Sequence, residues 1–285
     1  MSEIDSRLLS EELADKHRAL RENIRSMGRV VVAFSGGIDS SLVAHVAATE
    51  LGENALIATS GSASLKRSDL SLTQHLADRW KLNHRVITTD ELSNNEYRAN
   101  PTNRCFYCKT SLYTALQEIA ETEHYDYILN GTNTDDLGDH RPGLQAASDF
   151  SIRSPLVETE FCKRDIRTLA EYLGLENAQK PQAACLSSRF PYGSHITQER
   201  LAQVEAAEDV LADLGFTQYR VRHHEEVARI EIVAREMPHA IEVAEIIDER
   251  VRTCGYRFVS LDLGGFRSGA LNEGVIPTVQ IHEPG

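Results

Sequence analysis

The chain has 285 residues, which is enough for one large domain or for two unequal domains with a sizeable core. Its 30 basic and 43 acidic residues give a net charge of −13, which argues against stable nucleic-acid binding across a broad basic face and fits an enzyme acting on small molecules. The sequence shows no export leader and no apolar run near 18 residues, so we expect a cytoplasmic protein without a membrane span. The number of cysteines is odd, five, so we do not expect a disulfide framework.

The first two thirds of the chain alternate short apolar runs with helical patterns. An amphipathic helix is expected within residues 1–28. Strands are then predicted at 28–34, 55–59, 84–89 and 125–132, and helices at 39–51, 66–80, 106–121 and 161–175. This order predicts an α/β fold with a doubly wound parallel sheet, whose ligands bind beyond the carboxyl ends of the strands.

The pattern changes after residue 193. A helix is expected over 196–216, two alternating strands over 219–233, another helix over 236–252 and a strand over 256–263. We therefore predict two domains, 1–187 and a small α+β domain over 188–285. In the first alternating strand Arg220 and Arg222 share one face, and the neighbouring pair His223 and His224 is expected to face solvent in a turn.

The sequence SGGIDSS (35–41) follows the first strand and opens the first helix of the repeat. Gly36 and Gly37 let the backbone approach an anion, while Ser35, Ser40 and Ser41 add hydroxyl donors at a helix N-terminus. A Walker A loop would carry a lysine here, and this loop has none. The pattern predicts phosphate binding through backbone and hydroxyl groups.

Two further stretches leave alternatives open. Asp135, Asp136 and Asp139 follow the fourth strand, where they would hold a cation or form a solvated turn. Cys185, in KPQAACLSSRFPYG (180–193), is a buried filler, a metal or cluster ligand, or a nucleophile.

Taken together, SGGIDSS, NPTNRCFYCK, NGTNTDDLGDHRPG, KPQAACLSSRFPYG, RVRHHEEVARIEI and FRSGALN resemble the LarE family in identity and order, from about residue 28 to 272. Members are ATP-dependent sulfur transferases of nickel-pincer nucleotide biosynthesis, built on the PP-loop of the N-type ATP pyrophosphatases. The resemblance implies that the loop binds ATP, that Asp39 binds Mg²⁺ or orients the phosphates, and that Ser60, Gly131 and Thr132 line the nucleotide site.

The resemblance also implies how sulfur is delivered. ATP adenylates a carboxylate of pyridinium-3,5-biscarboxylic acid mononucleotide and releases pyrophosphate. Cys185 attacks, and cleavage of its Cβ–S bond yields a thiocarboxylate and leaves dehydroalanine. Alternatively, Cys105, Cys108 and Cys185 hold a [4Fe–4S] cluster that carries a sulfide, as some family members do.

The anionic nucleotide substrate needs local cations in an acidic protein. Arg220, Arg222 and Arg267 are the candidate phosphate ligands, and Glu208 and Glu231 are weak candidates for a metal site. The family implies a homo-oligomer and partner enzymes of nickel-pincer biosynthesis. The competing functions are amide synthesis, as in NAD synthase, tRNA thiolation, and a nucleotide-sensing binding module.

Overall fold

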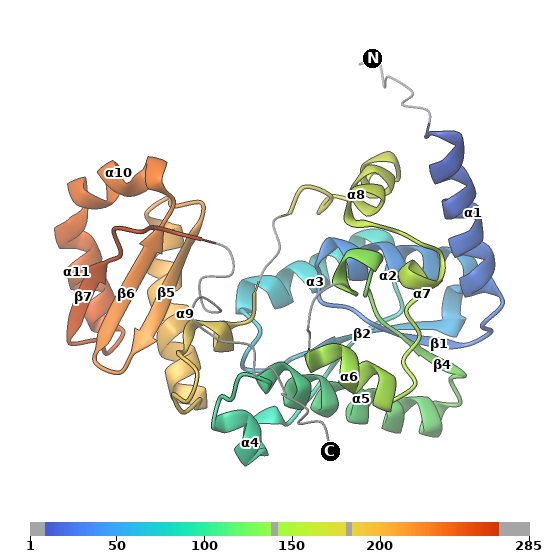
Figure 1. Cartoon of the computed structure of the whole chain (residues 1–285), viewed down its shortest axis with the longest axis horizontal. Coiled ribbons are helices and arrows are strands. Elements are labelled where there is room, and N and C mark those ends of the chain that lie inside the picture. Colours follow the sequence, from blue (N-terminus) through green and yellow to red (C-terminus); the bar gives the residue numbers. More distant parts are fainter. Residues whose placement is uncertain (1–8, 138–141, 181–183, 268–285) are drawn as a thin grey trace, which may run out of the picture. The chain divides into compact units, whose positions relative to one another are not determined.

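The computed structural model describes residues 9–137, 142–180 and 184–267, and it divides the chain into two compact units (Figure 1). Unit 1 comprises 1–185 and 195–197, and unit 2 comprises 186–194 and 198–285. The boundary between the two units therefore falls directly after Cys185, and residues 195–197 belong to unit 1 again.

Unit 1 is built on a four-stranded parallel sheet, which confirms the predicted α/β fold. Its strands run in the order β3-β2-β1-β4: β1 (Val30–Ala33), β2 (Ala55–Ser60), β3 (His84–Ile87) and β4 (Tyr127–Leu129). The chain proceeds from β1 to β2 and β3 on one side and then crosses to β4 on the other. The crevice between the carboxyl ends of β1 and β4 is therefore the topological switch point, where open α/β sheets bind ligands.

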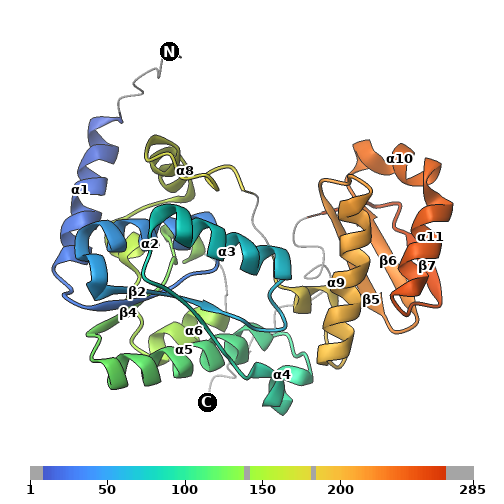
Figure 2. The ribbon, with the colours of Figure 1, turned by 180° about the vertical axis from the view of Figure 1, so that it is seen from behind.

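Helices cover both faces of this sheet, as the two ribbon views show (Figures 1 and 2). Alternate residues of β1 explain the arrangement, because Val30 and Val32 belong to the core on one face and Val31 to the core on the other. The first face carries α1 (Glu11–Arg25), α2 (Ile38–Leu51), α3 (Arg67–Trp80), α7 (Pro155–Glu158) and α8 (Lys163–Tyr172). The second carries α5 (Arg104–Glu123) and α6 (Pro142–Asp149), and the short α4 (Asn95–Arg98) precedes α5.

Within its described residues, unit 2 packs three α-helices with a three-stranded sheet of order β5-β6-β7, in which β5 and β6 are antiparallel and β6 and β7 parallel. The strands are β5 (Tyr219–His224), β6 (Val227–Ile232) and β7 (Phe258–Leu261), and the helices are α9 (Gln198–Asp213), α10 (Met237–Glu242) and α11 (Ala244–Thr253). Val221, Ile230 and Ile232 point into one apolar core. The single helix expected over 236–252 is interrupted at Val243, which closes α10 and precedes α11.

Three local expectations differ from the structure. His223 is buried at 2% exposure, because it lies within β5 on the core side rather than in the turn, while His224 is exposed. The fourth strand ends at Leu129, and the chain then turns toward the switch point. Helices α6 and α7 were not expected. No helix in the described part of the chain is both long and apolar enough to span a membrane.

Candidate active site

The phosphate loop, Ser35–Ser41, leaves the carboxyl end of β1 and enters α2 with Gly37 as the N-cap residue. Its hydroxyl groups brace it internally: the Ser40 Oγ donates to the Gly37 carbonyl at 3.0 Å and accepts from the Ser35 N–H at 3.2 Å. Gly36 has a φ of +71°, and a Cβ there would lie 2.9 Å from the Thr73 methyl. The loop thus needs glycine for its backbone angle and for its close packing.

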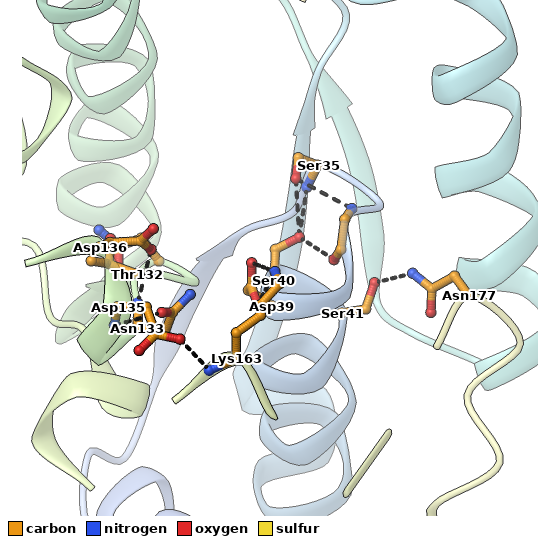
Figure 3. Close-up of polar contacts among 12 residues, drawn as sticks. Ser35, Asp39, Ser40, Ser41, Thr132, Asn133, Asp135, Asp136, Lys163 and Asn177 are labelled. Atoms are coloured by element: carbon orange, nitrogen blue, oxygen red, sulfur yellow. Dashed lines mark hydrogen bonds and ion pairs between the residues drawn. The ribbon is translucent and has the colours of Figure 1, made fainter. Parts of the chain in front are cut away.

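A second chain segment holds the loop from outside. The Asn177 Nδ2 donates to the Ser41 Oγ at 2.7 Å (Figure 3) and also to the Gly36 carbonyl at 3.0 Å. Ser41 is fully buried, so its hydroxyl braces the loop, and its expected contact with phosphate stays a prediction. The sequence analysis did not identify Asn177, because 141 positions separate it from Gly36 and no local pattern marks it.

The segment after β4 reaches the start of α2 at the switch point. Gly131 is the point of closest approach, since a Cβ there would lie 2.6 Å from the Ser40 nitrogen. The adjacent turn is fixed by side chains: the Asn130 Oδ1 accepts from the Thr132 N–H at 3.0 Å, and Asn133 caps the next short helix. Gly131 and Thr132 therefore lie beside the phosphate loop, as expected for residues of one nucleotide site.

Asp39, in the first turn of α2, is paired with a residue that the sequence analysis did not select. The Lys163 Nζ lies 2.7 and 2.5 Å from the two carboxylate oxygens of Asp39 (Figure 3). Burial raises the pKa of Asp39, the contact with Lys163 lowers it, and the charge of Asp136 raises it further. Asp39 and Asp136 are therefore near enough for their charges to interact, and carboxylate oxygens are ligands that Mg²⁺ prefers, but the role of Asp39 in metal binding stays a prediction. Asp139 lies outside the described residues.

Ser60 ends β2 on the same edge of the sheet, and its hydroxyl lies 2.6 Å from the Thr89 Oγ1. Next to it is a buried carboxylate that was not predicted, Glu91, which is 2% exposed. Its oxygens accept hydrogen bonds from Ser62, Ser64 and Thr89. These hydroxyl contacts explain how Glu91 is accommodated in the interior.

Two of the predicted thiols open α5. Cys105 is exposed, whereas Cys108 and Cys185 are partly buried. Burial, followed by the negative charges of Cys185 and Glu91, raises the pKa of Cys108 to about 12. Cys108 is therefore a protonated thiol at neutral pH, and Cys185 lies close enough to influence its pKa.

The described residues contain no group of three His, Cys, Asp or Glu side chains arranged to hold a metal. The structure therefore gives no support for a [4Fe–4S] cluster on Cys105, Cys108 and Cys185, and the cluster stays a prediction. Cys162 caps α8, and Cys254 follows α11.

In unit 2, Arg220 and Arg222 lie on the face of β5 opposite Val221, which belongs to the apolar core. Arg222 is 2% exposed; its Nε and one terminal nitrogen each lie 2.9 Å from Glu231, and its other terminal nitrogen donates to the Ser188 carbonyl at 2.8 Å. Arg189 pairs with buried Glu208 in the same bidentate manner, at 2.8 and 3.1 Å. Arginine therefore neutralises both glutamates, which disfavours the metal role expected for them.

Arg220 is situated differently from Arg222. Its guanidinium lies 4.8 Å above the Phe266 ring, and within the described residues it has no carboxylate partner. Burial, followed by the neighbouring charges of Arg189 and Arg222, lowers the pKa of Arg220, while the charges of Glu231 and Glu208 act in the opposite direction. Arg267 is exposed, and the rest of FRSGALN, residues 268–272, lies outside the described residues.

A parallel sheet with a lysine-free phosphate loop at its switch point defines unit 1 as a nucleotide-binding fold of the PP-loop class. In agreement, the asparagine synthase family model matches residues 16–137. A pyridinium-3,5-bisthiocarboxylic acid mononucleotide synthase from Lactiplantibacillus plantarum is 38% identical over 92% of this chain and 95% of its own.

Two uncharacterized proteins are also similar over their length. The one from Synechocystis is 41% identical over 91% of this chain and 98% of its own, and the one from Methanocaldococcus jannaschii is 31% identical over 87% and 94%. The chain belongs to the LarE family, the family of the Lactiplantibacillus synthase.

Proposed function

We propose that the chain is an ATP-dependent sulfur transferase that acts on a carboxylate of pyridinium-3,5-biscarboxylic acid mononucleotide. The observation that carries this proposal is the phosphate loop at the β1–β4 switch point, in a chain related to such a synthase over nine tenths of its length. The relationship covers 92% of this chain, more than the nucleotide-binding unit alone, and the sulfur transfer that it suggests would use a thiol such as Cys185, which amide synthesis by an NAD synthase would not require. It therefore favours this function over amide synthesis, tRNA thiolation and a binding module.

Adenylation requires a loop that orients a triphosphate for attack at the α-phosphate. The N–H groups at the start of α2, with the hydroxyl of Ser40, would bind the released pyrophosphate, and Ser60 and Thr132 would contact the nucleoside. Mg²⁺, held by Asp39 and Asp136, would neutralise phosphate charge. The carboxylate oxygen of the substrate attacks the α-phosphate, the bond to pyrophosphate breaks, and an acyl-adenylate forms.

Sulfur transfer then uses Cys185. Its thiolate attacks the acyl carbon, AMP leaves, and a thioester forms. A base removes the Cα proton of residue 185, and the electron pair of that C–H bond forms the Cα–Cβ double bond as the Cβ–S bond breaks. The products are a thiocarboxylate and a protein with dehydroalanine at position 185. The nearby Cys108 does not compete as a nucleophile, because its raised pKa keeps it protonated.

Recognition of the substrate phosphate is assigned to Arg220 within unit 2. Its guanidinium lies over the Phe266 ring, whereas that of Arg222 is committed to Glu231 and Ser188. Arg222 thus acts as a support for the same sheet face, and Arg267 adds an exposed cation. A charge-assisted phosphate contact of this kind contributes about 1.5–3 kcal/mol.

The decisive experiment combines product analysis with the mass of the intact protein. With ATP, Mg²⁺ and the pyridinium dicarboxylate nucleotide, we expect pyrophosphate, AMP and the thiocarboxylate, in one turnover, with loss of one H2S from residue 185. Cys185→Ala should retain adenylation and lose sulfur transfer. Formation of ADP and phosphate, or a thiocarboxylate made by Cys185→Ala, would overturn the proposal.

The same experiment separates the two sulfur sources. If Cys185 is sacrificed, Cys105→Ser and Cys108→Ser retain a single turnover. If a cluster carries the sulfide, either variant loses both transfer and an iron–sulfur absorption band, and wild-type protein turns over repeatedly with added sulfide.

We further propose that the enzyme acts in the cytoplasm as a homo-oligomer and passes its product to another enzyme of nickel-pincer biosynthesis. The supporting observation is membership of the LarE family. Light scattering of the purified protein tests the assembly, and a monomer would refute it.

A further inference from the structure

The Asn177 side chain gives both of its amide hydrogens to the phosphate loop. Its Nδ2 donates to the Gly36 carbonyl at 3.0 Å and to the Ser41 Oγ at 2.7 Å. A carbonyl only accepts hydrogen bonds, so the amide nitrogen and not the Oδ1 must face Gly36. The Oδ1 is buried and has no hydrogen-bond partner among the described residues. The amide is therefore oriented by the loop alone.

The backbone of Asn177 is held in place on both sides. Leu175 and Ala178 are buried and belong to the core on one face of the sheet. The Lys180 N–H donates to the Asn177 carbonyl at 3.0 Å, and the Lys180 Nζ lies 2.8 Å from the Asp69 Oδ1 of α3. Asn177, itself 5% exposed, is thus a rigid support for the loop.

The contact with the Gly36 carbonyl sets the direction of the next N–H group. The Gly36 carbonyl and the Gly37 N–H share one trans peptide plane, in which they point in opposite directions. Gly36 is buried and Gly37 is partly exposed, so a carbonyl held toward Asn177 turns the Gly37 N–H toward the open side of the loop. The Gly37 nitrogen lies 3.4 Å from the Ser35 Oγ, a long contact that a phosphate oxygen can replace.

The loop needs such a constraint from outside. It contains no lysine, so its backbone N–H groups must carry much of the phosphate binding. Two consecutive glycines leave the peptide between them free to rotate, because neither has a Cβ that limits its backbone angles. Asn177 supplies the restriction that the glycines lack.

We propose that Asn177 is a positioning residue for pyrophosphate binding: it holds the Gly36 carbonyl and thereby directs the Gly37 N–H at the two terminal phosphates of ATP. Asn177 itself does not touch the nucleotide. The proposal rests on the ATP-binding part of the proposed function and not on the identity of the carboxylate substrate.

The test uses Asn177→Asp, which keeps the size and shape of the side chain. The Ser41 hydroxyl can donate to the new carboxylate, whereas the Gly36 carbonyl is repelled by it, so the variant loses the one contact that orients the peptide. Titration calorimetry with Mg²⁺ and inorganic pyrophosphate should show binding about tenfold weaker than in wild type, the effect of one charge-assisted hydrogen bond. The affinity for AMP, which lacks the two terminal phosphates, should stay within about twofold of wild type, and a purely structural role would not separate the two ligands.

The matched control is Asn23→Asp in α1. The Asn23 Nδ2 donates to the Glu158 Oε2 at 3.0 Å, and its Oδ1 is also buried without a partner among the described residues. This variant places two carboxylates together far along the chain from the loop, so its melting temperature should fall while pyrophosphate binding stays at the wild-type value.

Three results would overturn the proposal: pyrophosphate affinity within about twofold of wild type in Asn177→Asp, equal weakening of AMP and pyrophosphate, or a comparable loss of pyrophosphate affinity in Asn23→Asp. Should Asn177→Asp not fold, Asn177→Ala is measured against the same limits.

The binding measurements need no acceptor. A wild-type protein that binds pyrophosphate and ATP but transfers no sulfur to the pyridinium nucleotide would remove the proposed function and leave the role of Asn177 standing. A wild-type protein that binds neither would overturn both.

Discussion

Arg222→Ala offers a sharp test of how unit 2 is stabilised. In the folded protein the Arg222 guanidinium makes two 2.9 Å hydrogen bonds to Glu231 and one of 2.8 Å to Ser188, and both charged side chains are 2% exposed. Alanine would leave the buried Glu231 carboxylate with only the terminal nitrogen of Arg229, at 3.1 Å. Removing one partner of a buried ion pair lowers the free energy of unfolding by about 3–5 kcal/mol. Because the contact between Arg229 and Glu231 remains, we expect a loss near the lower value.

The loss should appear mainly in unit 2. A change of about 3 kcal/mol lowers the melting temperature of a domain of this size by about 12–24 °C. The single tryptophan, Trp80, lies in α3 of unit 1, so its fluorescence follows unit 1 while far-ultraviolet circular dichroism follows both units. We expect the dichroism transition to shift and the Trp80 transition to stay in place.

Two companion variants isolate the cause. Arg250→Ala removes a pair with Asp213 whose side chains are 39% and 63% exposed, and should cost less than about 1 kcal/mol. Replacing Arg222 and Glu231 together with methionine should recover most of the stability, because no buried charge is then left unpaired. A loss below about 1 kcal/mol in Arg222→Ala would refute the reasoning.

Three other predictions follow from single contacts. Arg220→Ala should raise the KM for the nucleotide substrate about tenfold or more while leaving the melting temperature within a few degrees, as steady-state kinetics and calorimetry would show; an unchanged KM would place the phosphate elsewhere. Gly131→Ala should weaken ATP binding and cost about 1–3 kcal/mol in urea unfolding, since its Cβ would lie 2.6 Å from the Ser40 nitrogen; wild-type behaviour in both measurements would contradict this. Burial lowers the pKa of His223. Below a pH of about 6.5 the unfolded state therefore binds a proton that the folded state does not. The free energy of unfolding should then decrease by up to about 1.4 kcal/mol for each unit by which the pH is lowered. His223→Gln should flatten that slope in urea titrations at pH 7 and 5.5, and an identical slope would assign it to other histidines whose pKa is lowered by burial, such as His17, His45 and His84.

Local sequence patterns determined much of this protein. The order of strands and helices in unit 1, the phosphate loop at the end of β1, and the shared face of Arg220 and Arg222 all follow from side-chain periodicity and glycine spacing over a few residues. These features can be predicted from sequence because residues close together in the chain are also close together within one helix or strand. The motifs that resemble the LarE family are equally local, and the comparisons confirmed that resemblance.

The tertiary structure decided which charges neutralise one another. Lys163 reaches Asp39 across 124 positions, because α8 and α2 pack on the same face of the sheet, and no local pattern encodes that contact. The difference between Arg220 and Arg222 also depends on packing, since β6 presents Glu231 to one arginine and Phe266 lies beneath the other. Whether a charged side chain binds a ligand or supports the fold depends on partners brought together by folding, and the sequence alone does not record those distances.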